Sequence, residues 1–209
     1  MTTHVSAQPK PRRVRMATSA RREQIIAVAT TLIADRGFWG VTLREVAIAC
    51  GISEPGILHH VGSKDGLLVA VLEHRDHCDR KALAGRLGVA VSDLDADPAP
   101  FGLREMCTAA VERNATQPEI VRLYTVLQAE SLSETHPAFS YFGRREQLAL
   151  DLFSRAARTS GVPAAKISAV ARETLSAMNG LQLAWLRSDQ EFDFVDAWEA
   201  FADRFLPAD

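Results

Sequence analysis

Cysteine is scarce in this sequence, and the three present, Cys50, Cys78 and Cys107, are scattered and odd in number. This pattern gives no disulfide framework and is typical of a protein in a reducing compartment, so we expect a cytoplasmic protein. No apolar run follows the early basic residues, which predicts that there is no signal peptide. The densest apolar run, Leu67 to Leu72, is far too short to cross a bilayer.

Catalytic signatures are also missing. The chain has no Gly-x-Ser-x-Gly elbow, no phosphate-cradling glycine loop and no His-Glu-x-x-His motif, which argues against an enzyme and predicts no catalytic residue and no cofactor. His74, His77 and Cys78 would share one helix face, but structural zinc usually needs a fourth ligand, and the sequence places none nearby. We therefore interpret them as a solvated helix face and predict no metal.

Alternation of apolar and polar residues, the mark of a β-strand, persists nowhere in the chain. Apolar residues instead recur at the helical period, which predicts an all-α fold of about nine helices. Beyond the region of residues 42–61, the expected helices cover residues 19–36, 63–84, 101–115, 118–132, 136–159, 163–186 and 192–205. A glycine-, aspartate- and proline-containing loop is expected over residues 85–100.

The most informative stretch begins at Thr42, which with Glu45 has the spacing of a capping box at the start of a helix. Gly51 suits the left-handed position after that helix ends. Ser53 then caps a second helix, with Pro55 in its first turn, where proline loses no hydrogen bond. Two short helices joined by a glycine-containing turn form a helix-turn-helix, whose second helix enters the DNA major groove.

This stretch resembles the N-terminal DNA-binding domain of the TetR family of bacterial transcriptional regulators. The motif that carries the resemblance is Thr42, Val46-Ala47, Gly51-Ile52-Ser53, Gly56, His60, Ser63-Lys64 and Leu67-Leu68. The chain departs from the family at Leu58, where a phosphate-binding tyrosine is usual, and at Val61, where phenylalanine is frequent. We interpret both as packing residues and His59 as a substitute for the tyrosine.

The predicted DNA contacts fall into two groups. The residues of the second helix that can face the groove are Glu54, Gly56, Ile57, His59 and His60, and Ser53 and Pro55 at its start are also counted among the DNA-binding residues. Glu54 can accept from a cytosine amino group, and Ile57 can contact a thymine methyl group. Thr42, Arg44 and Lys64 lie at or near helix N-termini, where phosphates bind. For each, the alternative is an ordinary solvated or core residue.

Charge is distributed unevenly, although the net charge is only −2. Residues 1–64 hold nine basic and four acidic residues, whereas residues 65–209 hold 15 and 22. We expect residues 1–17 to form a disordered basic arm, residues 18–64 the helix-turn-helix domain, and residues 65–209 a second domain with a connecting helix. The arm can lie along DNA phosphates or a minor groove, or can serve only as a solubilising tail.

The resemblance implies that residues 65–209 bind a small-molecule effector and form a homodimer. The expected effector lining is mixed aromatic, methionine and amide: Met106, Tyr124, Gln128, Phe139, Phe142, Met178, Gln182 and Trp185. Gln128 and Gln182 are informative as amides expected to be buried. An apolar stripe of Trp198, Phe201 and Phe205 suits the dimer interface. Ordinary intramolecular core is the alternative for both sets.

Together these features predict a cytoplasmic, homodimeric repressor that binds a near-palindromic operator and is released by an effector. Half-sites about 34–36 Å apart would match the two-fold axis of the dimer. Two alternatives remain open. One is a constitutive DNA-binding protein whose second domain only dimerises. The other is a small-molecule carrier or enzyme with a vestigial DNA-binding domain.

Overall fold

The computed structural model describes residues 17–207, which fold into helices and connecting turns without a β-strand in that range. The α-helices are α1 (Thr18–Arg36), α2 (Leu43–Cys50), α3 (Glu54–Val61), α4 (Lys64–Leu87), α5 (Leu103–Ala115), α6 (Pro118–Glu130), α7 (Phe139–Thr159), α8 (Ile167–Arg187) and α9 (Phe194–Phe205). Two short 3-10 helices, η1 (Val91–Asp95) and η2 (Ala164–Lys166), complete the described chain. The all-α prediction of about nine helices is confirmed. The expected basic arm lies outside the described residues, except for Ala17.

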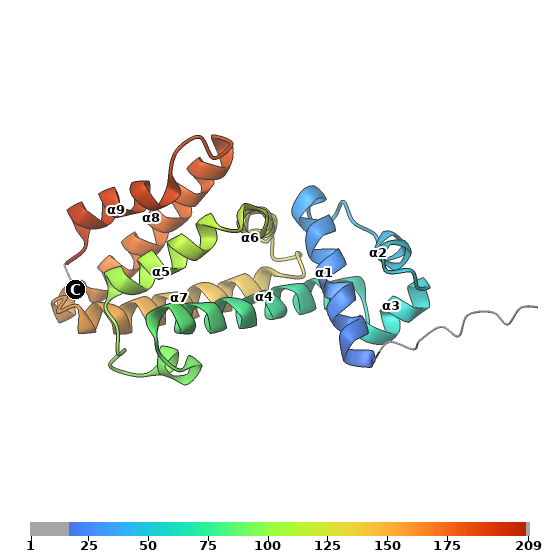
Figure 1. Ribbon diagram of the computed structural model, residues 1–209, viewed down its shortest axis with the longest axis horizontal. Helices are drawn as coiled ribbons and strands as arrows, with labels where there is room; N and C mark the ends of the chain where they lie inside the picture. The colour runs from blue at the N-terminus through green and yellow to red at the C-terminus, as the bar shows by residue number, and fades with distance from the viewer. Residues whose placement is uncertain (1–16, 208–209) are drawn as a thin grey trace, which may run out of the picture.

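The molecule is elongated, with α1, α2 and α3 gathered at one end (Figure 1). Helix α4 starts directly after α3 and runs 24 residues from that end into the rest of the molecule. Helices α8 and α9 lie at the other end, and α7 packs extensively against α8 (Figure 1). Any change in the position of α4 therefore bears directly on α3.

Helices α2 and α3 begin where the sequence predicts, because side-chain oxygens cap them. Thr42 Oγ1 accepts from the backbone N–H of Glu45 at 3.2 Å, and Glu45 Oε2 accepts from the Thr42 N–H at 2.8 Å. Gly51 ends α2 with φ 66°, a left-handed conformation that glycine adopts without steric cost.

The first of two hydrophobic cores lies beneath the helix-turn-helix. Its fully buried members include Ile25, Phe38, Val46 and Leu68. The same cluster continues into α6 and α7, where it takes in Leu127 among other residues. The N-terminal helices thus share one core with part of the remaining chain.

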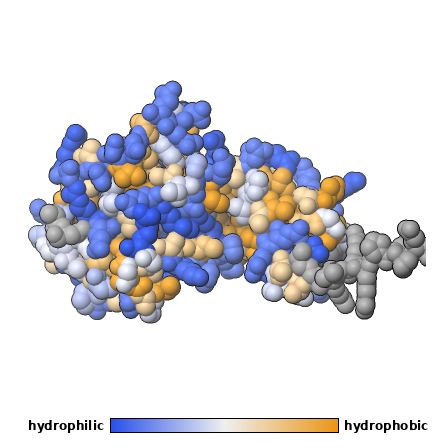
Figure 2. Space-filling model, viewed as in Figure 1, coloured by the Kyte–Doolittle hydropathy of each residue, from blue (hydrophilic) through white to orange (hydrophobic). Residues whose placement is uncertain are grey.

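The second core lies between α5, α7, α8 and α9, and its fully buried centre includes Leu103, Cys107 and Trp198. Leu94 from η1 is also fully buried there, and its carbonyl accepts from Arg155 Nη2 at 3.1 Å. The expected loop is therefore an ordered, packed segment. The face seen in Figure 2 carries hydrophobic residues in small patches separated by hydrophilic ones. Within residues 17–207, no helix combines the length and apolarity required to cross a membrane.

Several helix boundaries differ from the sequence expectation. Helix α4 continues three residues past Ala84, because Gly85 remains helical and Gly88 supplies the left-handed cap at φ 68°. Helix α7 begins at Phe139 rather than near residue 136, since His136 Nδ1 instead accepts from the Ala138 N–H at 3.1 Å. Such shifts at helix ends reflect local capping contacts that helical periodicity does not encode.

Candidate nucleic-acid interface

Three helix N-termini, those of α2, α3 and α4, are each capped by a hydroxyl. Thr42, Ser53 and Ser63 accept from the backbone N–H three residues ahead, at 3.2, 3.3 and 2.9 Å respectively. All three capping residues are exposed to solvent. A helix N-terminus leaves further N–H groups without intrahelical partners and carries a partial positive charge, so each of these ends can receive a phosphate.

The exposed surface of α3 carries the candidate base-reading side chains. Glu54 and His59 are exposed, and His60 is partly buried with its ring centroid 5.5 Å from that of His59. Pro55 is exposed in the first turn, and Gly56 adds no side chain beside it. Carboxylate and imidazole groups can accept from and donate to base edges, so this surface has the chemistry of a reading head.

Two predictions on α3 need correction. Ile57, expected to face the groove, is 0% exposed and belongs to the first core, so it has no surface with which to contact a thymine. Leu58, expected to pack inward, is 38% exposed. Residues four apart share a helix face, and here Ile57 and Val61 form the inward pair, which turns Leu58 outward.

Lys64, a predicted phosphate contact, is held by aromatic rings at the start of α4. Its Nζ lies 4.5 Å from the centroid of Phe38 and 5.7 Å from that of Trp39. Phe38 is buried, whereas Trp39 is 63% exposed. The attraction between the ammonium group and the ring faces keeps the charge of Lys64 beside the capped N-terminus of α4.

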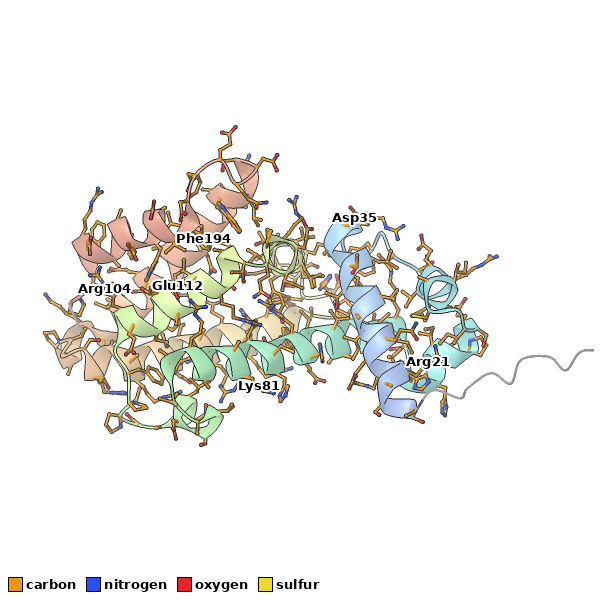
Figure 3. The ribbon with its side chains drawn as sticks, in the orientation of Figure 1. Arg21, Asp35, Lys81, Arg104, Glu112 and Phe194 are labelled. Carbon is orange, nitrogen blue, oxygen red and sulfur yellow. The ribbon has the colours of Figure 1, made fainter. Side chains whose placement is uncertain are left out.

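Arg44 is exposed on α2, close to the capped Thr42 end. Its neighbour Glu45 is held by the Thr42 hydroxyl, by Arg36 Nη1 at 2.8 Å and by the Thr42 backbone, and these contacts lower the pKa of Glu45 to about 2. Arg21, which the sequence interpretation missed, reaches the Cys50 carbonyl at 3.4 Å from the start of α1, at the α2–α3 end of the molecule (Figure 3). Its place at the start of the first helix, next to the basic segment, was the available signal.

The predicted effector residues do not surround one cavity. Met106 and Trp185 are buried in the second core, where Trp185 stacks on Phe194 at 5.0 Å, and Met178 packs against the same core. Gln182 is partly buried, accepts from Asn114 Nδ2 at 3.2 Å and donates to Thr125 Oγ1 at 3.3 Å. These four side chains fill the interior or bind neighbouring side chains.

Two other predicted residues, Gln128 and Phe142, line a cavity of about 190 Å³ between α6, α7 and α8. Gln128 is exposed, contrary to the expectation of a buried amide, because the outer side of α6 turns it toward solvent. Phe139 is 40% exposed at the start of α7 and belongs to neither core. A larger groove, of about 460 Å³, lies along α4, α5 and α9 beside Arg104 and Glu112, which Figure 3 places on α5.

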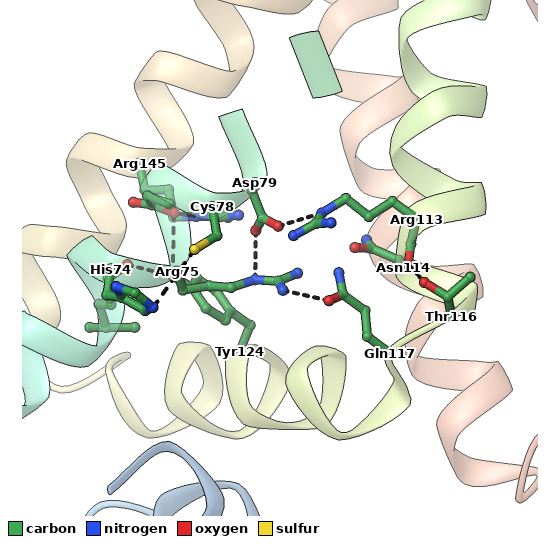
Figure 4. A network of polar contacts seen from close by, with 12 residues as sticks. His74, Arg75, Cys78, Asp79, Arg113, Asn114, Thr116, Gln117, Tyr124 and Arg145 are labelled. Carbon is green, nitrogen blue, oxygen red and sulfur yellow. Dashed lines mark hydrogen bonds and ion pairs between the residues drawn. The ribbon is translucent and has the colours of Figure 1, made fainter. Parts of the chain in front are cut away.

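Tyr124 of α6, the remaining predicted effector residue, belongs to a polar network between α4, α6 and α7 (Figure 4). Its hydroxyl donates to the Leu72 carbonyl at 3.0 Å and lies 3.3 Å from Asp76 Oδ1 and 3.2 Å from the Tyr141 hydroxyl. The Tyr141 hydroxyl donates to Asp76 Oδ2. Burial raises the pKa of both tyrosines, so both hydroxyls remain protonated, and that of Tyr141 donates to the carboxylate.

The network continues along α4 through a buried arginine. Arg75 Nε lies 2.6 Å from Asp79 Oδ2, and Arg113 Nε of α5 donates to the other oxygen of Asp79 at 2.9 Å. Arg75 Nη1 also donates to Gln117 Oε1 at 2.9 Å (Figure 4). These charged groups fix α4 against α5 and α6, which the spacing of apolar residues did not indicate.

The aromatic stripe predicted for the dimer interface is divided by the fold. Trp198 is 0% exposed, and its Nε1 donates to Thr108 Oγ1 at 2.9 Å, so it packs within its own chain and not at an interface. This corrects the prediction for Trp198, because the first member of the stripe is buried against α5. Phe201 is partly buried, and Phe205 is 66% exposed.

The histidine and cysteine side chains on α4 lie on its outer side. Cys78 Sγ and His74 Nε2 are 3.7 Å apart, and His77 is exposed nearby. Within residues 17–207, no group of three or more histidine, cysteine, aspartate or glutamate residues is placed to hold a metal ion.

Comparison with known proteins finds similarity to bacterial regulators in the N-terminal part of the chain. Residues 25–71 match the family model described as bacterial regulatory proteins, tetR family. The HTH-type transcriptional repressor KstR2 of Rhodococcus jostii (strain RHA1) is 37% identical over 54 residues, and KstR2 of Mycolicibacterium smegmatis (strain ATCC 700084 / mc(2)155) is 36% identical over 61 residues. These matches span 26% and 29% of either chain, so they cover little more than a quarter of the relatives.

Solved structures extend the likeness to the whole fold. A TetR transcriptional regulator from Legionella pneumophila has a TM-score of 0.69 at 20% identity, covering 88% of this chain and 95% of that chain. A transcriptional regulator from Saccharomonospora viridis, solved in complex with choline, has a TM-score of 0.66 at 21% identity with the same two coverages. At such identities the likeness shows the fold, and the family match is confined to residues 25–71.

Proposed function

We propose that this chain, which belongs to the TetR family of bacterial regulatory proteins, is a cytoplasmic repressor that binds a near-palindromic operator as a homodimer and is released by a small-molecule effector. The observation that carries the proposal is the surface around α3. There Glu54 and His59 are exposed between three hydroxyl-capped helix N-termini, with the cation of Lys64 at the third. Base-reading groups flanked by phosphate sites are what sequence-specific binding requires.

The proposed DNA contacts follow from exposure. Glu54 and His59 read base edges, with His60 beside them, while Thr42, Arg44, Ser53 and Lys64 hold phosphates. Arg21 joins the phosphate set because it projects from the same end of the molecule (Figure 3). Ile57 supports α3 from beneath.

Dimerisation is proposed through the outer sides of α8 and α9, at the end opposite α3 (Figure 1). Leu183 and Phe205 are large apolar side chains that remain 44% and 66% exposed there. Covering them with the same surface of a second copy would give a two-fold dimer. Two reading heads would then meet half-sites about 34–36 Å apart.

Effector response would pass through α4, because this helix joins α3 to the network of Asp76 and Asp79. An effector that binds one position of α4 better than another changes the separation of the two reading heads. By linkage, operator binding must then weaken effector binding by the same factor, commonly about 5–150-fold.

A constitutive DNA-binding protein is the second candidate. Met106 and Trp185, two of the residues expected to line an effector site, are packed in the second core. If the second domain only dimerises, no small molecule will change operator affinity. The two candidates share the DNA-binding step and differ only in that response.

Selection of the full chain on a random duplex library, at fixed near-physiological salt, tests the proposal. Salt must be fixed because phosphate contacts make affinity steeply salt-dependent. Enrichment of one near-palindrome is expected, and Arg44→Ala with His59→Ala should abolish it while leaving thermal unfolding unchanged. Folded protein that enriches no sequence would contradict the proposed function.

A further inference from the structure

The cavity of about 190 Å³ between α6, α7 and α8 has walls of two kinds. Phe142 and Leu175 give it apolar surface, and Arg145 of α7 and Arg172 of α8 bring two guanidinium groups to it. Glu146 is the one acidic residue in the lining, so the walls carry an excess positive charge. A cavity with an apolar side and a cationic side suits an amphiphilic anion.

Arg145 is oriented before any ligand arrives. Its guanidinium carbon lies 4.7 Å from the centroid of the Tyr124 ring, and its Nε donates to Asp76 Oδ1 at 3.1 Å. Because this bond uses Nε, the two terminal amino groups keep their N–H donors for another acceptor. The side chain remains 41% exposed, which leaves it accessible.

Arg172 is held only weakly. Its Nη1 lies 4.0 Å from Glu146 Oε1, and both side chains are more than half exposed. An ion pair so long and so exposed contributes little to stability, so a ligand can displace Glu146 at small cost. Arg172 is therefore available to bind the anionic group of a ligand.

We propose that this cavity binds a small organic carboxylate, whose anionic group is held by Arg145 and Arg172 and whose apolar part contacts Phe142 and Leu175. Arginine forms paired, charge-assisted hydrogen bonds with carboxylates, which favours this class over neutral molecules. The cavity is smaller than the roughly 300–1,000 Å³ of drug-sized sites, so the acid is small. This inference deepens the proposed effector response and rests on it.

The same arginine connects the cavity to the DNA-binding end. A carboxylate bound to the terminal amino groups of Arg145 and to Arg172 draws the Arg145 side chain into the cavity and away from Asp76, which belongs to α4. Loss of this contact leaves Asp76 with the hydroxyls of Tyr124 and Tyr141 alone among the contacts described, and loosens α4 from α7. The acid thereby weakens operator binding without touching α3.

Calorimetric titration of the full chain with benzoate and hexanoate tests the proposal, with benzamide, hexanamide and inorganic phosphate as comparison probes at constant ionic strength. At least one of the two carboxylates should bind saturably, whereas its amide and phosphate should not. Arg145→Gln and Arg172→Gln should each weaken binding at least tenfold. Arg144→Gln, which removes the same charge at the adjacent position outside the cavity lining, should leave binding unchanged.

Four results of the titrations would contradict the proposed carboxylate site. Absence of carboxylate binding, equal binding of the amides, binding of phosphate alone, or full affinity in Arg172→Gln would each overturn the assignment. Arg172 is exposed and outside the Asp76 network, so its variant tests the site even if Arg145→Gln fails to fold. Protein that binds its selected duplex but no carboxylate contradicts this inference alone, whereas protein that binds no duplex contradicts the proposed function.

Discussion

The backbone N–H of Phe38 donates to Glu130 Oε2 at 3.2 Å, which joins the segment after α1 to the C-terminal end of α6. The Glu130 side chain is only 25% exposed, and Phe38 is buried in the first core. Through this bond and the shared core, the DNA-binding end and the rest of the chain are expected to unfold together.

Glu130→Ala should therefore destabilise the protein, since it leaves a buried N–H without its acceptor. The expected cost is about 1–3 kcal/mol in the free energy of unfolding. Glu130→Gln keeps an acceptor oxygen and should lose less. Urea unfolding followed by circular dichroism checks both, and equal losses in the two variants would show that the hydrogen bond is unimportant.

Gly37→Ala should also destabilise, for two separable reasons. Gly37 has φ 70° and ψ 171°, a conformation almost confined to glycine, and a Cβ there would lie 2.4 Å from Glu130 Oε1. The backbone strain alone is about 1–3 kcal/mol. In a double-mutant cycle, Glu130→Ala should relieve the clash but not the strain, so a fully additive cycle would argue against the clash.

Ile57→Ala should reduce stability and His59→Ala should reduce operator affinity, although the two residues lie only two positions apart. Ile57 is fully buried, so its truncation should lower the free energy of unfolding by about 2–5 kcal/mol. His59 is exposed and should affect operator affinity, by about 1–3 kcal/mol, with little change in stability. Thermal unfolding and fluorescence anisotropy measure the two quantities, and loss of affinity in folded Ile57→Ala alone would reverse the assignment.

The lowered pKa of Glu45 predicts that the stability of the protein depends on pH. Its pKa is lowered from 4.5 to about 2 by hydrogen bonds from the Thr42 hydroxyl, Arg36 and the Thr42 backbone, so the unfolded state takes up the proton first as pH falls. Its contribution to stability is thus fully present above about pH 4.5 and is lost as pH falls toward 2. The difference in melting temperature between wild type and Glu45→Gln should shrink over that interval. A difference independent of pH would contradict this account.

Lys64→Ala should weaken binding to specific and non-specific duplexes alike, because it removes a phosphate contact. The slope of log affinity against log salt should decrease by about 1. Trp39, whose ring lies 5.7 Å from Lys64 Nζ, should report binding by a change in fluorescence that this variant alters. Lys81→Ala, an exposed lysine on α4 away from α3, is the matched control and should retain the wild-type slope (Figure 3).

The presence of the helices could be predicted from the sequence because interactions between residues close in the chain determine it. The Thr42 and Glu45 capping box, the left-handed Gly51 and the helical period all act within a few residues. Which side of α3 points into the core was harder to predict. The inward position of Ile57 and Val61 depends on which side of α3 is covered by α2 and α4. A sequence lists both Ile57 and Leu58 as apolar and does not say which is covered.

The interior of the second domain was least predictable. Trp198 could serve an interface or a core, and only its bond to Thr108 on α5 decides between them. The Asp76 network joins residues 48 to 69 positions apart, which no local pattern reveals. Aromatic content indicated where large side chains lie, but not the charged groups between them.

The central claim is sequence-specific DNA recognition, and the ratio of two affinities tests it most directly. Anisotropy titrations should compare the selected duplex with a scrambled duplex of the same length and composition, at one near-physiological salt concentration. The account predicts at least about 10³-fold tighter binding to the selected duplex. A ratio near one, with folded protein, would mean that the basic end only attracts phosphates and that α3 reads no sequence.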